Sequence, residues 1–323
     1  MQRTLQWLSA LHILVFSLTG CELSPDVVIC ENGTPPVLGT PATIQEIPTK
    51  LGPPVQLFTY DPARENTFTS LQGTAVLIPA NAFVNENGQP ITTPVHLEMR
   101  EVFNKADMVL AAMPTISNGR ILESAGELYL SPQEKVKWAD GKTIEMTTTI
   151  PPSVTNMNGM RLFSGASNPT VGCFNWDVVL DTGSALALTG QTFPQAKVTI
   201  SSTLLNTGAT WINIDKFLPE APKDTIVANI PGDPVDVAKN TMAFALIRDR
   251  NSVIRLCDSS KPGTLQTPGI PLGTAVSVVV IRTLNSKMYF GRTNTIVDGK
   301  MDLSPNILEI TPEALVDSLK LLK

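Results

Sequence analysis

Histidine is nearly absent from this sequence, and its scarcity limits the kinds of catalytic site that the chain can form. Of 323 residues only His12 and His96 are histidines, and His12 lies in the N-terminal apolar stretch. A Ser-His-Asp triad, a Cys-His pair or a multi-histidine metal site would have to be built around His96. Residues 95–103 alternate between apolar and polar, which directs His96 to the surface beside Glu98. We therefore expect a surface or structural role for His96.

Long runs of one charge and long apolar segments are both missing. The net charge is -5, and no run of lysine or arginine occurs, which argues against nucleic acid as a partner. Beyond residue 20 no apolar segment approaches the ~20 residues that a transmembrane helix needs. Helix-period patterns are scarce, while glycine, proline, threonine and valine are frequent. This composition is typical of an all-β protein.

The N-terminus carries the one motif that indicates a location. Arg3 precedes an apolar run over residues 8–18, and Leu-Thr-Gly-Cys occupies positions 18–21. This is the order of a secretory signal with a small-residue cleavage site. A cysteine directly after the small residues resembles a bacterial lipobox, which implies cleavage between Gly20 and Cys21 and a diacylglyceryl thioether on Cys21, usually with an acylated amine such as a palmitoyl amide. We expect residues 1–20 to be a signal peptide and the lipid on Cys21 to hold the protein on a membrane. The alternative is an ordinary secretory peptide followed by a chance cysteine.

The other three cysteines, Cys30, Cys173 and Cys257, remain after lipidation of Cys21. An exported compartment permits disulfides, and an odd count leaves at least one cysteine unpaired. Our candidate pair is Cys173 with Cys257. None of the cysteines stands in a Cys-x-x-Cys motif or at a Cys/His metal spacing, so we expect no zinc or redox site.

Proline marks residues 21–55 as a tether between the lipid and the body. Seven prolines fall between positions 24 and 54 and favour extended, unpaired backbone. The alternative is that residues 43–47, which alternate, form an edge strand on the body.

Short strands separated by turn signals fill the body. We expect one β-sandwich domain over residues 56–168, a second over residues 169–310, and a helix over residues 311–323 that Thr311 and Pro312 begin. Residues 276–281 are all apolar except Ser277 and predict a central strand buried on both faces.

Several motifs of the body also resemble a known family. These are Gly-x-x-x-Leu-Ile-Pro-Ala-x-Ala-Phe from residue 73, Gly-Glu-Leu-Tyr-Leu at 126–130, Lys-x-Ile-x-Met-x-x-x-Ile-Pro from residue 142, Thr-Trp-Ile-Asn-Ile-Asp-Lys-Phe at 210–217 and Ile-Pro-Leu-Gly at 270–273. They resemble a family of Gram-negative bacterial surface lipoproteins with a ZU5-like β-sandwich domain. The resemblance implies a ZU5-like fold for residues 56–168 and a place in the cell envelope, but no reaction.

One local motif is similar to a catalytic signature. Val-Val-Leu-Asp-Thr-Gly-Ser at 178–184 resembles the catalytic turn of aspartic proteases, with Asp181 as the carboxylate. The chain has no second Asp-Thr-Gly, so we interpret these residues as a polar turn after a strand. An Asp181-based protease remains the alternative. Self-cleavage at Phe163-Ser164, known from some ZU5-related modules, is a second alternative.

Four glutamates of the first half are the remaining candidates for chemistry. We interpret them as solvated surface groups or a weak Ca²⁺ contact rather than a glycosidase pair, because no aromatic platform lies nearby in the sequence. They are Glu98, Glu101, Glu123 and Glu127.

These observations predict a lipid-anchored cell-envelope protein of the outer membrane, with no catalytic residue, metal site or cofactor. It would act as a binding, scaffolding or adhesive module toward a protein or polysaccharide ligand. The alternative is an accessory lipoprotein that docks on an outer-membrane transport or secretion complex.

Overall fold

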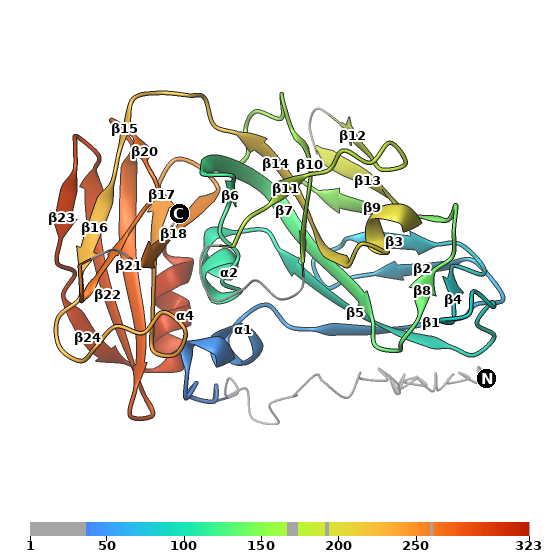
Figure 1. Cartoon of the computed structure of the whole chain (residues 1–323), viewed down its shortest axis with the longest axis horizontal. Coiled ribbons are helices and arrows are strands. Elements are labelled where there is room, and N and C mark those ends of the chain that lie inside the picture. Colours follow the sequence, from blue (N-terminus) through green and yellow to red (C-terminus); the bar gives the residue numbers. More distant parts are fainter. Residues whose placement is uncertain (1–36, 167–173, 191–193, 259–260, 323) are drawn as a thin grey trace, which may run out of the picture. The chain divides into compact units, whose positions relative to one another are not determined.

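The computed structural model describes residues 37–166, 174–190, 194–258 and 261–322. Residues from Leu38 onward form one compact unit (Figure 1). The predicted signal peptide at 1–20, Cys21 and Cys173 lie outside the described residues.

The first half of this unit is a sandwich of two antiparallel sheets. The seven-stranded sheet has the order β1-β5-β7-β14-β10-β11, with β6 paired to β7, and the five-stranded sheet has the order β12-β13-β9-β3-β2. The strands of the seven-stranded sheet are β1 (Gln56–Tyr60), β5 (Val95–Val102), β6 (Ile116–Ser117), β7 (Arg120–Pro132), β10 (Arg161–Ala166), β11 (Asp177–Val178) and β14 (Ala209–Phe217). Those of the five-stranded sheet are β2 (Asn66–Thr69), β3 (Ala75–Ile78), β9 (Thr143–Thr149), β12 (Ala185–Thr189) and β13 (Gln195–Ser201). The short pair β4 (Phe83–Val84) and β8 (Lys137–Trp138) lies beside them.

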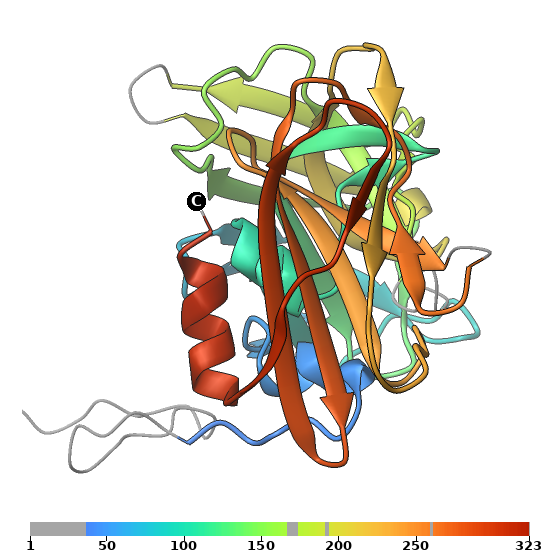
Figure 2. The ribbon, with the colours of Figure 1, turned by 90° about the vertical axis from the view of Figure 1, so that its left-hand side faces the viewer.

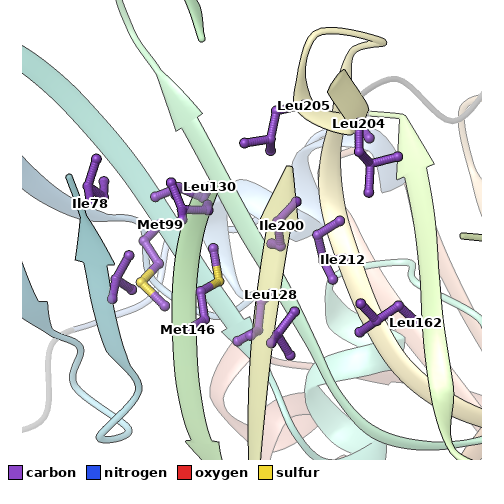
Figure 3. Close-up of a cluster of buried hydrophobic side chains, with 14 of the residues drawn as sticks. Ile78, Met99, Leu128, Leu130, Met146, Leu162, Ile200, Leu204, Leu205 and Ile212 are labelled. Atoms are coloured by element: carbon purple, nitrogen blue, oxygen red, sulfur yellow. The ribbon is translucent and has the colours of Figure 1, made fainter. Parts of the chain in front are cut away.

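Alternating apolar side chains from the two sheets form the core of the sandwich. Leu128, Leu130 and Ile212 of the seven-stranded sheet pack with Ile78, Met146 and Ile200 of the other sheet (Figure 3). Burial of each such side chain contributes about 1.5–3 kcal/mol, so this layer is the main stabilising feature of the first half.

The second half is built on one eight-stranded sheet of order β23-β16-β19-β18-β17-β21-β22-β24. Side chains of β16 and β21, which lie far apart in this order, share one core, so the sheet curves around it (Figure 2). The strands are β16 (Ile226–Asn229), β17 (Thr241–Ile247), β18 (Ser252–Asp258), β19 (Thr264–Gln266), β21 (Ala275–Leu284), β22 (Lys287–Ile296), β23 (Met301–Leu303) and β24 (Ile307–Ile310), and a short pair is formed by β15 (Lys223–Asp224) and β20 (Ile270–Pro271).

Strand β21 confirms the prediction of a central strand buried on both faces. It pairs with β17 on one side and β22 on the other. Val278 and Val280 point into the core of the curved sheet, while Val279 and Ile281 point to its outer face. The all-β class with a C-terminal helix is confirmed as well.

Short helices fill the layer between the outer face of the curved sheet and the sandwich (Figures 1 and 2). They are η1 (Ile44–Glu46), α1 (Ile47–Lys50), α2 (Lys105–Leu110) and α4 (Pro312–Lys320), and a further short helix, α3 (Ser202–Leu205), follows β13. Thr311 begins α4 as predicted, because its side chain accepts a hydrogen bond from the Ala314 amide at 3.2 Å. Leu315 and Leu319 then lie in the same core as Met108 of α2.

The expected tether over residues 21–55 is too long. Leu38 and the residues after it belong to the compact unit, and Ile44, Ile47 and Leu51 are buried. Their spacing of three and four residues places them on one helical face, which explains why this proline-rich segment packs on the body instead of remaining extended. The edge strand considered for residues 43–47 is not formed either, because this segment is helical.

The expected domain boundary between residues 168 and 169 does not coincide with a break in the sheets. Strand β13 pairs with β9, and β14 inserts between β7 and β10. The strands up to Phe217 therefore complete the first sandwich, and the chain enters the curved sheet only after that residue.

Candidate functional site

Of the residues in the predicted lipid site and the predicted disulfide, the structure describes only Cys257. Gly20, Cys21 and Cys173 lie outside the described residues, whereas Cys257 on β18 is disulfide-bonded. Phe174, the neighbour of Cys173, and Cys257 line the same small cavity. This proximity supports the predicted pairing of Cys173 with Cys257, which stays a prediction.

Asp181 stands in a hydrogen-bonded turn before β12. Its Oδ2 atom accepts hydrogen bonds from the hydroxyls of Ser184 at 2.7 Å and Ser201 at 2.6 Å, and the Ser201 hydroxyl also accepts from the Leu204 amide. The Ser201 hydroxyl, followed by that of Ser184, lowers the pKa of Asp181. The carboxylate thus ties the turn to the start of α3, in agreement with the structural interpretation of this motif.

His96 is exposed, and its Nδ1 atom lies 2.6 Å from the carboxylate of Glu134. Glu98 accepts a hydrogen bond from Gln133 on the same surface. Phe163 and Ser164 lie inside β10, where both are paired with β11 and β14.

The interpretation of the other three glutamates as solvated is wrong. Glu101, Glu123 and Glu127 are almost completely buried. Glu101 accepts a hydrogen bond from the Ser70 hydroxyl at 2.7 Å, and Glu123 pairs with Lys216 at 3.0 Å. Glu127 has no hydrogen-bond partner for either carboxylate oxygen among the described residues.

A bulge between β7 and β14 gathers these buried polar groups. Asn213 pairs with Glu127, but Asp215, two residues further, pairs with Ser124, three residues back along β7. The extra residue on β7 brings Ser124 and Glu127 to the same face of the sheet, although regular alternation would separate them. Gly126 is required here, since it has a φ of +145° and an added Cβ would lie 2.4 Å from the ring of Phe103.

The bulge holds a chain of hydrogen bonds and two buried acids. The Ser124 hydroxyl donates to Asn213 at 3.0 Å, and the Asn213 amide donates to Asp215 at 2.7 Å. Burial raises the pKa of Asp215 to about 8, and burial followed by the charge of Asp215 raises that of Glu127 well above its usual range. Both shifts favour the protonated forms of these side chains.

A pocket of about 580 Å³ opens near this network, at the turn between β17 and β18. Its walls come from the start of α2, the end of α4, Ser153 and residues 248–251 of the turn. The side chain of Asn251 connects the pocket to the bulge by donating to the carbonyls of Phe103 at 3.0 Å and Ser124 at 2.8 Å. We call this cavity the basic pocket because its lining includes Lys105, Arg248, Arg250 and Lys320.

Lys105 is the buried cation of the basic pocket. Only 8 % of its surface is exposed, and its Nζ atom donates to the carbonyls of Ile247 at 2.8 Å and Arg248 at 3.1 Å. Burial lowers the pKa of this ammonium to about 8. Two of its three N–H donors are therefore used, and both partners are neutral.

The four basic side chains of the pocket differ in whether they form ion pairs. Arg250 lies 3.4 Å from Glu123 and 3.8 Å from Asp249. Lys105, Arg248 and Lys320 form no ion pair within the part of the chain that the structure describes.

Sequence reasoning missed the basic pocket because its cations come from three distant segments. Lys105 and Arg248 are 143 positions apart in the chain. The available signal was the cluster Arg-Asp-Arg-Asn at 248–251, a charged turn between two apolar strands.

Among the described residues no cluster of three or more histidine, cysteine or acidic side chains suits a metal ion. No helix in the described ranges is long and apolar enough to cross a membrane. No protein-family model matches the chain, and no curated protein is significantly similar to it.

Proposed function

We propose that this protein is a lipid-anchored component of the cell envelope, held at the outer membrane, that acts as a ligand-binding module without catalysis. The lipid would be carried by Cys21, directly after the small residues Leu-Thr-Gly. The observation that carries the binding role is the basic pocket, because it is already open between α2, α4 and the β17–β18 turn and has a size usual for small-ligand sites.

The surroundings of Asp181, the candidate protease residue, favour a binding protein over a protease. Asp181 accepts hydrogen bonds from two serine hydroxyls and organises its own turn. A catalytic aspartate dyad needs a second carboxylate that shares its proton. We expect the wild-type protein and the Asp181→Asn variant to show no difference in pepstatin-sensitive proteolytic activity at acidic pH.

The lipid anchor is tested by the intact mass of the protein purified from membranes. The wild-type chain should begin at Cys21 and carry the mass of a diacylglyceryl group and an acyl chain. Cys21→Ala should remain unlipidated, whereas the matched variant Cys30→Ala should be processed like the wild-type protein. A wild-type chain that is cleaved elsewhere or lacks lipid would overturn the anchoring.

The location is tested by protease treatment of intact cells, followed by detection of α4. Loss of the C-terminal signal before permeabilisation would indicate the outer surface, and loss only afterwards the periplasm. Recovery of the protein in the inner-membrane or cytoplasmic fraction would contradict the proposal.

A further inference from the structure

The charge of the basic pocket is opposite to that of the whole protein. The chain has a net charge of -5, yet four basic side chains and a single acid, Asp249, line this cavity. Arg250 lies near Asp249 and Glu123, and the charges of Asp249 and Asp107 also act on Lys105 and Lys320, respectively, but Lys105, Arg248 and Lys320 form no ion pair among the described residues.

Lys105 is the side chain of the pocket that a bound anion would stabilise most, because its ammonium group is buried. A buried ammonium is costly unless a negative charge lies against it, and its two carbonyl partners carry none. Its third N–H donor is unused among the described residues and its side chain lines the cavity. An anion bound here would restore the charge that burial disfavours.

The basic side chains without an ion pair and the volume of the cavity indicate the charge and the size of the ligand. A phosphate monoester carries about -1.5 to -2 charges at neutral pH and three acceptor oxygens. Lys105, Arg248 and Lys320, from three separate elements, supply a matching set of donors. A cavity of about 580 Å³ is far larger than one phosphate group, and Ala106, Leu319 and Leu322 give it an apolar wall.

On these grounds, and resting on the proposed binding function, we propose that the basic pocket binds a phosphate monoester of a sugar-sized molecule. Lys105 would contact the phosphate from the buried side, and Arg248 and Lys320 from the exposed side. The phosphate could be free or belong to a lipid headgroup, because the group recognised is the same.

The test is calorimetric titration of the purified full-length mature protein in a nonionic detergent. Glucose 6-phosphate is the soluble probe, with glucose and inorganic phosphate as its two parts. Lysophosphatidic acid in the micelles is the lipid probe, with lysophosphatidylcholine as its control. Binding of glucose 6-phosphate or lysophosphatidic acid, in preference to the respective controls, would support the proposal and identify the source of the phosphate.

Variants assign the binding to this pocket. Arg248→Ala and Lys320→Ala change exposed side chains and should each weaken binding about tenfold, as loss of one charge-assisted hydrogen bond does. Lys105→Met should weaken it at least as much, and Arg292→Ala, an exposed arginine on β22, should leave it unchanged. Because Lys105 is buried, its variant is first checked for cooperative unfolding, and the two exposed variants decide the question if it does not fold.

Three results would overturn the proposal. They are the absence of binding to either phosphate probe, equal binding of inorganic phosphate and the ester, and unchanged affinity in Arg248→Ala and Lys320→Ala. Each leaves the lipid on Cys21 untouched, so the failure of this inference is distinguishable from that of the anchoring.

Discussion

On one face of the seven-stranded sheet, Leu128, Leu130 and Ile212 pack against a second sheet, whereas the other face carries Glu127, Asn213 and Asp215 in the layer of helices. Both faces are buried in apolar cores, but the second core also holds the bulge with its two buried acids. Apolar packing requires only shape and volume, while each buried polar group needs a partner. The difference indicates that the first face stabilises the sandwich, whereas the polar groups of the second face are connected with the proposed binding site, the basic pocket.

Substitutions at two neighbouring residues of β7 offer the strongest test of this comparison. Leu128→Ala removes a fully buried side chain from the apolar core and should lower the free energy of unfolding by about 3 kcal/mol. Glu127→Gln, on the other face, keeps the volume and removes the free-energy cost of protonating a buried acid on folding, so at neutral pH it should raise the free energy of unfolding rather than lower it. Urea denaturation of both variants measures the contrast. Equal losses would mean that the two faces contribute alike.

The pH dependence of stability examines the polar face alone. The pKa of Asp215 is raised to about 8 in the folded protein from an ordinary 3.8, mainly by burial. Between these values the folded chain holds a proton that the unfolded chain has lost. The contribution of Asp215 to the free energy of unfolding therefore falls as the pH rises from about 4 to 8, by up to about 1.4 kcal/mol per pH unit.

Asp215→Asn should remove this contribution, so that its unfolding free energy exceeds that of the wild-type protein increasingly from pH 5 to 8. Urea denaturation at several pH values measures the slope. Asp181→Asn is the matched control, because the lowered pKa of Asp181 keeps its carboxyl ionised in both states over this range. The same slope in Asp215→Asn and the wild-type protein would show that Asp215 is not protonated in the fold.

The smallest expected effect concerns the helix layer. Thr311→Ala removes the hydroxyl that accepts from the Ala314 amide at the start of α4 and should cost about 1 kcal/mol. Ser304→Ala, an exposed change just before β24, should cost less than about 0.5 kcal/mol. Urea denaturation gives the free energies, and hydrogen exchange should show faster opening of α4 in Thr311→Ala only. Equal exchange in the two variants would contradict the capping role.

Features set by local sequence were predictable. The strands expected over residues 95–103 and 276–281 follow from their alternating and continuous apolar patterns, and β5 (Val95–Val102) and β21 (Ala275–Leu284) form there. The threonine and proline before α4 are a capping signal that acts within one helical turn. In each case the residues that decide the structure are neighbours in the chain.

Features set by distant pairing were not predictable. The insertion of β14 between β7 and β10 depends on residues as far apart in the chain as Leu122 and Phe217, so the interval near 168 resembled a boundary. The bulge that buries Glu127 is likewise a property of two strands together, and alternation along β7 alone gives no sign of it. The basic pocket depends on three segments, and no pattern within any one of them requires the others.

The early start of the folded body, at Leu38, sets a limit on where it could work. Leu38 lies only seventeen positions after Cys21, and a fully extended chain of that length spans at most about 60 Å. With the proposed lipid in place, the first residue of the body could not leave the membrane surface by more than this distance. Ligands would then be captured within a thin shell beside the bilayer, where the motion of an attached protein is two-dimensional and encounters with membrane-bound partners are correspondingly frequent.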